Sequence, residues 1–387
     1  MRGLESLALG HEYSGPMVTR IDTIIVGGGA MGSAAAWQMA ARGRDVTLLE
    51  RFSPGHALGS SHGASRNFSV GYSDPGYVGM LVEARRLWRE LEAEFDVSLL
   101  ELVGIVNHGA NPNYDGMHKA LAVVDMPTEF LPAAEAEKRW PGIRFDGRVL
   151  YMPEAGRLNA EASVNALQAA ARARGADIRY NTPVTRLDVL SDDRVRVITD
   201  DEVFEARRAI VTVGAWTSKL VAGIVPLPSL VVTDAQTAHF EVLDPAVHWP
   251  GFNHVPNPAD TSYDYWISPI YGLLTPGEGV KVGWHGSGPV VDPDSRNFDA
   301  DPAQLTALAQ YARDWLPGVD ADRFSFASCT STTTPDSNFV LASSGPVAVG
   351  AGFSGHGFKF TPAIGRILAD LSDGSGPAPR LESSPWP

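Results

Sequence analysis

Apolar and polar residues follow two different periods along residues 21–50. An unbroken apolar run at 21–26 predicts a buried strand, and small apolar residues at 30–42 predict a helix. Gly43 ends that helix, and a second apolar strand then runs to Glu50. This strand–helix–strand order predicts a βαβ unit with parallel strands.

A long amphipathic helix is predicted after a polar loop at 54–66. Asp74 and Pro75 are typical of a helix start, with the acid as N-cap and the proline at the first helical position. The apolar residues that follow recur at helical spacing: Tyr77, Leu81, Ala84, Trp88, Leu91 and Phe95. We expect them to form one buried face.

The middle of the chain changes from irregular to periodic. Residues 98–150 are irregular apart from a short helix predicted at 132–140. Residues 158–220 return to alternating helix and strand, with a helix at 160–174 and strands at 177–180, 184–190, 194–199, 202–205 and 209–213. We expect this block to extend the sheet that the first βαβ unit begins.

The last third of the chain has a different composition. Residues 226–324 are rich in β-branched and aromatic residues, which predicts an antiparallel sheet with one wet or ligand-lined face. A strand at 347–350 and a helix at 362–371 complete the pattern.

The turn after the first strand has the spacing of a dinucleotide-binding motif. Gly27, Gly29 and Gly32 follow G-x-G-x-x-G, and Glu50 ends the next strand 18 residues later. Such glycines allow a tight turn, a close approach to pyrophosphate and close helix–strand packing, and the acid binds a ribose hydroxyl. A glycine-rich turn without nucleotide is the alternative, but the strand–helix–strand context favours a bound dinucleotide.

Fold class and domain limits follow from these patterns. We expect a mixed α/β (α+β) protein in which a Rossmann-type nucleotide domain is interleaved with an antiparallel-sheet substrate domain. The expected nucleotide domain comprises 20–90, 150–225 and 325–372, and the substrate domain comprises 91–149 and 226–324. Residues 1–19 are expected to be a disordered extension and 373–387 a mobile tail.

Composition and charge restrict the class of protein. The 387 residues are 44% hydrophobic and 20% charged, as in ordinary globular proteins. The net charge of −14 argues against nucleic acid or an anionic membrane as a partner. Cys329 is the only cysteine, so no intrachain disulfide can form, and no apolar run is long enough to span a membrane. Without a signal-peptide pattern at residues 1–20, we expect a cytoplasmic protein, and no metal site is predicted.

Four separated motifs together resemble one family. They are the glycine motif at 27–32 with Glu50, G-S-S-H-G-A-S-R at 59–66, G-V-K-V-G-W-H at 279–285, and Cys329 with G-A-G-F-S-G-H-G-F-K-F at 350–360. In this order they resemble the monomeric sarcosine oxidase and N-methyltryptophan oxidase group of D-amino-acid-oxidase-like flavoprotein amine oxidases. The resemblance implies that the nucleotide is FAD.

The resemblance also implies candidate catalytic residues. Lys281 corresponds to a lysine beside the flavin, where a fixed positive charge stabilises the anion that forms as O₂ is reduced. Arg66 would lie across the other face of the flavin, and His62 and His285 would line the pocket. A solvated lysine, a surface salt bridge of Arg66 and a solvent-facing His62 are the alternatives.

Further residues are implied to contact the cofactor. Cys329 corresponds to the family's covalent attachment point, a thioether to the flavin 8-methyl carbon, although a lone cysteine is otherwise read as a small buried hydrophobe. The other expected cofactor contacts are Arg51, Ser61, Val184, Gly352, Gly355, Gly357 and Lys359. The glycines would permit close backbone approach to the flavin.

Two departures from the family concern the substrate. Lys359 matches a lysine that pairs with the substrate carboxylate, but Ser69 stands where the family usually has a second arginine, and Ser331 where it tends to have tyrosine. A hydroxyl cannot replace a bidentate guanidinium. We therefore expect poor activity on sarcosine and a roomier pocket, with Trp266 as a candidate substrate contact unless it serves core packing.

The predicted reaction is oxidation of a C–N bond in a secondary amine, an N-alkyl or cyclic amino acid, to an imine with reduction of O₂ to H₂O₂. Three alternatives stay open. They are a biosynthetic oxidase acting on an unusual amine or imine, a dehydrogenase with another electron acceptor, and a non-catalytic flavin-binding scaffold. The sequence leaves the oligomeric state undecided.

Overall fold

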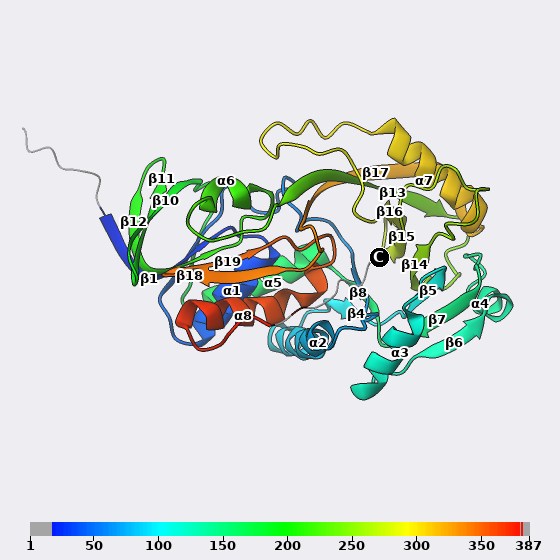
Figure 1. Ribbon diagram of the computed structural model, residues 1–387, viewed down its shortest axis with the longest axis horizontal. Helices are drawn as coiled ribbons and strands as arrows, with labels where there is room; N and C mark the ends of the chain where they lie inside the picture. Colours follow the sequence, from blue (N-terminus) through cyan, green and yellow to red (C-terminus); the bar gives the residue numbers. More distant parts are fainter. Residues whose placement is uncertain (1–17, 380, 382–387) are drawn as a thin grey trace, which may run out of the picture.

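A computed structural model describes residues 18–379 and 381. Within them the strands form two eight-stranded sheets and one three-stranded sheet. The two large sheets lie in opposite halves of the molecule, one at the left and one at the right of Figure 1.

The first sheet contains the predicted βαβ unit. Its strands are β1 (Val18–Val26), β2 (Val46–Leu49), β9 (Asp177–Arg179), β10 (Val184–Ser191), β11 (Arg194–Thr199), β12 (Val203–Val211), β18 (Val340–Ser344) and β19 (Val347–Ala351). The order is β10-β11-β12-β1-β2-β9, with β19 also paired to β12 and β18 to β19. β1 runs parallel to both β2 and β12, so the glycine turn after β1 lies at the carboxyl edge of the sheet.

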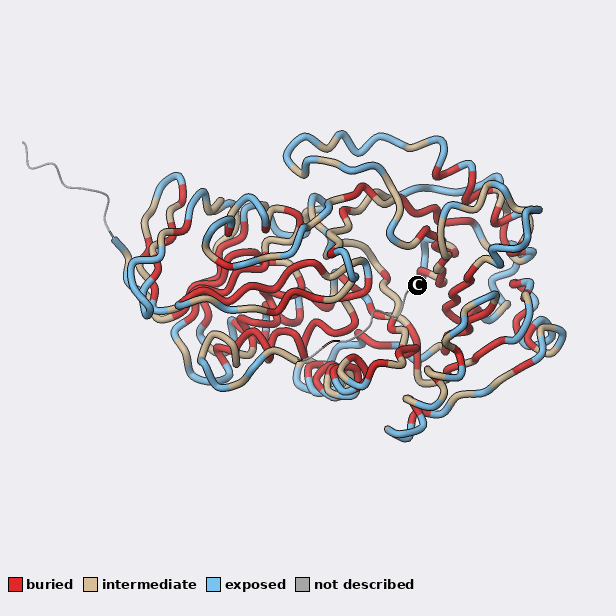
Figure 2. The backbone as a smooth tube through the Cα atoms, in the orientation of Figure 1, coloured by how far each residue is buried: buried red, intermediate tan, exposed pale blue. Residues whose placement is uncertain are grey.

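Three helices supply much of the core of this half: α1 (Ala30–Ala41), α5 (Ala160–Ala173) and α8 (Thr361–Asp373). Gly365 lets α8 approach α1, because a Cβ there would lie 2.5 Å from the Ala34 carbonyl carbon. The buried strands in the left half of Figure 2 lie between this helical layer and a second apolar cluster on β10–β12.

The second large sheet has mainly antiparallel pairs. Its strands are β5 (Ile105–Gly109), β6 (Glu129–Pro132), β7 (Arg148–Met152), β13 (Val231–Val242), β14 (Gly251–Val255), β15 (Ile270–Thr275), β16 (Gly279–Trp284) and β17 (Val319–Thr333). The order is β17-β13-β16-β15-β14-β5-β7-β6, and only β14 and β5 pair in parallel. Helix α7 (Pro302–Trp315) packs against β13 and β17.

The remaining elements are a small sheet, four helices and two 3₁₀ turns. The small sheet comprises β3 (Arg66–Phe68), β4 (Leu100–Glu101) and β8 (Gly156–Leu158). The other helices are α2 (Pro75–Phe95), α3 (Tyr114–Val123), α4 (Ala133–Arg139) and α6 (Thr217–Val221), with 3₁₀ turns η1 (Gly214–Trp216) and η2 (Phe358–Phe360).

The predicted fold class is confirmed, and several element limits need correction. Asp74 caps α2 as predicted, since its side chain accepts a hydrogen bond from the Tyr77 amide. The strands predicted at 202–205 and 209–213 are one strand, β12, because it pairs with β1 along its whole length. Helices α3 and α7 were not predicted.

Three of the expected limits between the two domains fall inside an element. The limits at 90/91, 149/150 and 324/325 divide α2, β7 and β17 respectively. β17 belongs entirely to the second sheet, where it pairs with β13 from Val319 to Thr333. Residues 325–333 are therefore part of that sheet and not of the first.

The expected ends of the chain are also corrected. Val18 and Thr19 belong to β1, where they pair with Val203 and Phe204, and residues 1–17 lie outside the described part. At the other end Asp373 closes α8. Ala378 and Leu381 pack against the core, while residues 380 and 382–387 lie outside the described part.

Candidate functional site

A cavity of about 550 Å³ lies between the two large sheets, and we call it the main cavity. It is lined by the glycine turn after β1, the polar loop at 54–66, residues of β13, β16 and β17, and the glycine run at 352–357. These segments are far apart in sequence. The fold therefore assembles all four family-like motifs around one space.

The glycine turn at one end of the main cavity is sterically specified. Gly27 has φ of +103°, and a Cβ at Gly32 would lie 1.8 Å from the Gly27 carbonyl oxygen. Gly32 thus serves helix–strand packing and does not line the cavity, which Gly27 and Gly29 do. The turn leaves backbone exposed to a ligand, as a close approach to phosphate requires.

Glu50 is buried beside this turn. Its Oε2 accepts a hydrogen bond from the Gly28 amide at 2.6 Å, and its Oε1 accepts one from the Phe52 amide at 2.9 Å. Burial raises the pKa of the Glu50 carboxyl, but hydrogen bonds from His56 and the two backbone amides outweigh it and hold the pKa below its usual value. Glu50 is therefore an anionic acceptor at the end of β2.

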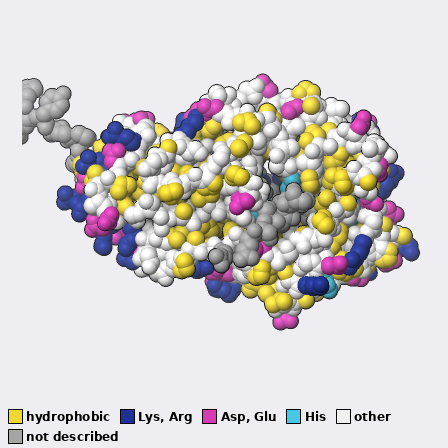
Figure 3. All heavy atoms as spheres, viewed as in Figure 1, with side chains coloured by type: hydrophobic (Ala, Val, Ile, Leu, Met, Phe, Trp, Pro, Cys, Tyr) yellow, Lys and Arg dark blue, Asp and Glu magenta, His cyan; other side chains and the backbone are white. Residues whose placement is uncertain are grey.

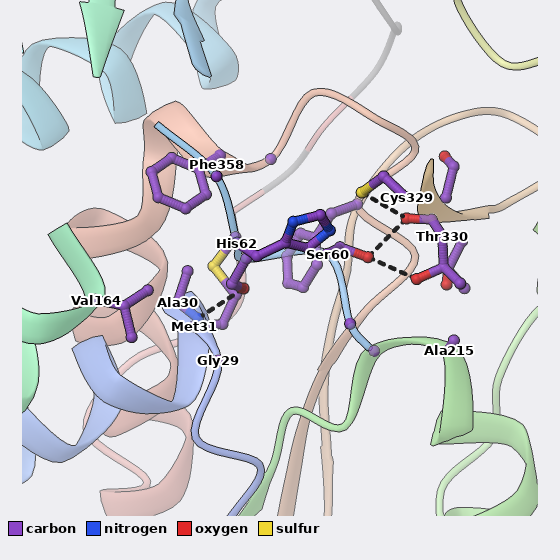
Figure 4. A pocket seen from close by; sticks show the side chains of 18 of the residues that line it. Gly29, Ala30, Met31, Ser60, His62, Val164, Ala215, Cys329, Thr330 and Phe358 are labelled. Atoms are coloured by element: carbon purple, nitrogen blue, oxygen red, sulfur yellow. Dashed lines mark hydrogen bonds between the residues drawn. The ribbon is translucent and has the colours of Figure 1, made fainter. Parts of the chain in front are cut away.

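Ser61 and Ser60 tie the polar loop to both halves. The Ser61 hydroxyl accepts from the Ala30 amide at the N-terminus of α1 at 3.0 Å. The Ser60 hydroxyl donates to the Thr330 carbonyl oxygen on β17 at 2.6 Å, next to the half-buried free thiol of Cys329. Figure 4 shows Ser60 and Thr330 joined by these bonds, with the Cys329 sulfur beside them.

Lys281 on β16 lies inside the protein, 7% exposed. Its ammonium donates to the Ser65 carbonyl and hydroxyl oxygens, both at 3.0 Å. Burial, with help from nearby Arg66, lowers the pKa of Lys281 to about 7, although Glu278 and Cys329 oppose the shift. The alternative of a solvated lysine does not describe this environment.

Arg66 and His62 lie close to Lys281. The Arg66 guanidinium donates to three backbone carbonyls, those of Ser60, His62 and Ser65, at 2.7–3.0 Å. No described carboxylate pairs with it, so a surface salt bridge is not its role here. Burial and the charge of Arg66 lower the pKa of His62 to about 4, so the imidazole is neutral at pH 7.

Lys359, which also lines the main cavity, ends a buried polar chain. Its ammonium donates to the Tyr72 hydroxyl at 3.0 Å and to the His356 carbonyl at 2.8 Å. His356 Nε2 lies 3.0 Å from the Ser337 carbonyl, and burial lowers the pKa of His356 to about 3, so the neutral ring carries its proton on Nε2. Tyr72 then donates to His356 Nδ1 and accepts from Lys359.

The mouth near the glycine turn is crossed by a segment from the second half. Asp294, between β16 and α7, accepts hydrogen bonds from Arg51 at 2.8 Å, from the Trp216 indole at 2.7 Å and from Lys219 at 2.6 Å. These donors hold the pKa of Asp294 at about 2. Arg51 therefore lines the main cavity in an ion pair that joins the two halves.

The structure brings most of the predicted residues to the main cavity. Those not yet placed also line it: Val184, His285, Ser69, Ser331, Gly352, Gly355 and Gly357. Burial lowers the pKa of His285 to about 3, so it too is neutral. The Ser331 hydroxyl is buried and has no hydrogen-bond partner among the described residues.

Trp266 is the exception among the predicted substrate contacts. It does not line the main cavity and instead packs in the core cluster of the second half. Its ring lies 4.7 Å from His254 and 5.3 Å from Tyr311. Tyr263, Tyr265 and Trp266 thus serve core packing, because Tyr311 and Trp315 of α7 pack against them.

Sequence reasoning missed several polar residues of the site. Tyr72 lies six residues after Arg66, His356 lies within the glycine run at 350–360, and half-buried Tyr271 lies on β15. Only His356 stood inside a motif. Tyr72 carries no local signal, because its role depends on contact with Lys359, 287 positions away.

These residues fit an FAD molecule. A Cβ at Gly28 would lie 2.9 Å from Glu50 Cβ, so this position has no room for a side chain and presents bare backbone. The buried carboxylate of Glu50 lies where a ribose would be held. The cavity continues from this cradle to the glycine run at 352–357, where backbone can approach a flavin ring.

Residues 18–379 and 381 contain neither a membrane-spanning helix nor a metal-binding cluster. No helix there is long and apolar enough to cross a membrane. No group of His, Cys, Asp and Glu side chains in the same residues is arranged to hold a metal ion. On the face shown in Figure 3, Lys and Arg side chains gather mainly at the left end of the molecule, with Asp and Glu side chains among them.

Comparison with known proteins agrees with this geometry. The family model described as FAD dependent oxidoreductase (DAO) matches residues 22–371. The chain is 31% identical over 372 residues to monomeric sarcosine oxidase of Bacillus sp. (strain B-0618), covering 92% of this chain and 93% of that protein. It is 28% identical to N-methyl-L-tryptophan oxidase of Yersinia pestis (strain Pestoides F), covering 90% and 94%.

A solved structure shows the same fold. NikD, described as an unusual amino acid oxidase essential for nikkomycin biosynthesis, superposes in its open form with a TM-score of 0.81 and 28% identity, over 93% of this chain and 96% of that one. The chain therefore belongs to the DAO family of FAD-dependent oxidoreductases.

Proposed function

We propose that the protein oxidises a C–N bond of a secondary amine, an N-alkyl or cyclic amino acid, to an imine and passes the electrons to O₂. The observation that carries the proposal is the pair of buried lysines, Lys281 and Lys359, that line one cavity together with the glycine cradle. Neither lysine pairs with a carboxylate among the described residues. Each ammonium is thus available to an anion that comes from outside the protein.

FAD bound in this cavity supplies the redox chemistry, since it accepts a hydride from the carbon beside nitrogen and gives two electrons to O₂. The protein supplies position and charge. Glu50 and the glycine turn hold the nucleotide, and the glycine run at 352–357 offers its backbone to the flavin.

The two lysines have different roles in the proposal. Lys281, fixed on Ser65, stabilises negative charge that develops during O₂ reduction. Lys359 holds a carboxylate of the amino acid. The neutral histidines His62 and His285 and the hydroxyls of Ser69 and Ser331 shape the pocket without adding charge. No protein base is needed if the amine binds in its neutral form.

We further propose that Cys329 carries FAD as a thioether. Its thiol is free, half-buried and part of the cavity wall. After acid denaturation the yellow colour should stay with the wild-type protein, whereas Cys329→Ala should release it. Ser331→Ala, two residues along the same strand, is the matched control and should keep the colour. Colour in the supernatant of the wild type would contradict the linkage.

A second candidate is a biosynthetic oxidase for an unusual amine or imine. It is favoured by Ser69 and Ser331, which stand where the resemblance implies arginine and tyrosine, and by the likeness to NikD, whose description names such a role. This candidate keeps the same chemistry and changes only the substrate. A cytoplasmic location is part of the proposal in either case.

O₂ consumption by the purified holoenzyme against a panel of amines tests the proposal. The panel should contain sarcosine, larger N-alkyl and cyclic amino acids, and the corresponding primary amines. We expect turnover of at least one secondary amino acid with formation of H₂O₂. No O₂ consumption, but amine-dependent reduction of an artificial acceptor dye, would indicate a dehydrogenase instead.

A further inference from the structure

A side cavity of about 20 Å³ adjoins the main cavity beside Lys359. Ser69, Asn253 and Lys359 line both, so the two cavities meet at these three residues. A single water needs roughly 10–15 Å³, so the side cavity admits about one oxygen-sized group.

Two of the side chains that line this space, Tyr114 and Asn253, are neutral hydrogen-bond donors. Tyr114, at the start of α3, is 6% exposed, and its hydroxyl has no partner among the described residues. Burial and the charge of Asp146 raise the pKa of Tyr114 above its usual value, so it remains a neutral donor. Asn253 on β14 is 3% exposed and uses one amide N–H on the Asn107 side-chain oxygen at 2.8 Å, which leaves the other N–H for a ligand.

Lys359 supplies the positive charge at the same place. Two of its three N–H groups are bound to the Tyr72 hydroxyl and the His356 carbonyl, so one remains. No described carboxylate neutralises it, although it is 5% exposed. Buried charges are normally paired, and buried hydroxyls normally have partners. One anionic oxygen acceptor would satisfy both lysine and tyrosine.

We propose that the side cavity binds one oxygen of a ligand carboxylate, held by the Tyr114 hydroxyl and the Asn253 amide beside Lys359. The inference rests on the proposed function for the class of ligand, an amino acid, but the anion site itself requires no oxidation. Ser69 keeps the space accessible, because an arginine at this position would extend a longer charged side chain into it. One ammonium and two neutral donors thus stand in place of a guanidinium clamp.

The test uses the holoenzyme and a pair of non-reacting probes, cyclohexanecarboxylate and cyclohexanecarboxamide, with Kd measured by calorimetry at pH 7. The wild type should bind the carboxylate at least about tenfold more tightly than the amide, because hydrogen bonds to charged groups are the stronger ones. Tyr114→Phe should weaken carboxylate binding roughly tenfold and leave amide binding within about twofold.

Two controls separate binding from folding. Tyr311→Phe removes a buried hydroxyl that contacts His254 at 3.2 Å, away from both cavities, and should leave both Kd values unchanged. Tyr114→Phe removes a hydroxyl without a described partner, so its unfolding temperature should not fall. In a Ser69→Arg background the effect of Tyr114→Phe should disappear, because the arginine then supplies the contact.

An unchanged carboxylate Kd in Tyr114→Phe would overturn the inference, since the side cavity would then hold only a water. Equal binding of the two probes by the wild type would overturn it without any variant. Should no amine be oxidised while carboxylate binding depends on Tyr114, the proposed function fails and the anion site stands. If amino acids are oxidised but Tyr114→Phe has no effect on carboxylate binding, the proposed function stands and the anion site fails.

Discussion

The surroundings of Lys281 and Lys359 differ although both lysines are buried in the same cavity and burial brings both pKa values to about 7. Lys281 lies among charges: Arg66 lowers its pKa, and Glu278 raises it. Lys359 lies among neutral groups, the Tyr72 hydroxyl and the His356 carbonyl, and burial alone causes its shift.

The difference indicates what each lysine can do. Around Lys281, the cross-strand neighbour His239 bonds the half-exposed Glu278 at 3.1 Å, so nearby charges partly compensate the ammonium. Such a site suits the negative charge that develops briefly during O₂ reduction, because it needs no permanent counter-ion. Around Lys359 no described charge compensates the ammonium, which suits a ligand that brings its own carboxylate.

Removing the charge at Lys281 should have the largest effect. In Lys281→Met, reoxidation of the reduced enzyme by O₂ should slow by about three orders of magnitude, because one well-placed charge at a developing anion is worth that much. Anaerobic reduction by amine should stay within about tenfold. Stopped-flow absorbance measures both steps. Unchanged reoxidation would move the role to another cation, with Arg66 as the next candidate.

Removing the charge at Lys359 should weaken the binding of a ligand carboxylate and leave the reaction with O₂ unaffected. Lys359→Met should raise the Kd of a ligand carboxylate roughly 100-fold, since truncating one partner of a buried charge pair costs several kcal/mol. The rate of reoxidation should not change beyond about twofold. Equal losses of binding and of O₂ reactivity in both lysine variants would contradict the division of roles.

The pH dependence of folding sharpens the comparison without any ligand. An unfolded lysine titrates near 10.5, whereas folded Lys281 titrates near 7, so between pH 7 and 9 the unfolded state binds more protons and stability rises with pH. The contribution over this window is about 2 kcal/mol. Lys359, whose pKa is also about 7, adds an equal rise, so denaturant unfolding of the apoprotein at pH 7 and 9 should show both, and Lys281→Met should lose about half of the total. A variant with the wild-type pH dependence would show that Lys281 is charged throughout.

A substitution at Ser69 should have the smallest effect. Ser69→Arg should raise kcat/KM for sarcosine by roughly tenfold, part of the 2–4 kcal/mol that a charged bidentate partner contributes. In the wild type, kcat/KM should instead increase with the apolar size of the amine, because each buried methylene contributes about 0.8 kcal/mol. Wild-type activity that is highest on sarcosine would contradict the pocket argument.

Motifs and periodicity within short segments predicted most of the nucleotide half of the molecule, but they predicted fewer elements of the substrate half. The glycine turn and Glu50 are adjacent in the βαβ unit, so spacing alone located them. Helix α7 was missed although Asp301 and Pro302 repeat the start signal of α2, because the aromatic and β-branched residues around it favoured strands. Helix α3 lacks a side-chain cap and contains Gly116, so its signal is weak.

The polar residues of the substrate end could not be read from spacing. Tyr72, Tyr114, Asn253 and Lys359 come from four distant segments and meet only after the two halves are folded together. Trp266 was predicted to contact the substrate but packs in the core, because an aromatic residue in a polar run is equally suited to a pocket and to a core. The family resemblance placed Lys359, and only the structure placed its neighbours.

The most direct test of the proposed reaction is a single-turnover experiment on the purified holoenzyme. An N-alkyl or cyclic amino acid added without O₂ should bleach the yellow flavin absorbance, and admitting O₂ should restore it with one H₂O₂ formed per flavin. Bleaching that O₂ cannot reverse, or absorbance that no secondary amine in the panel changes, would contradict the account.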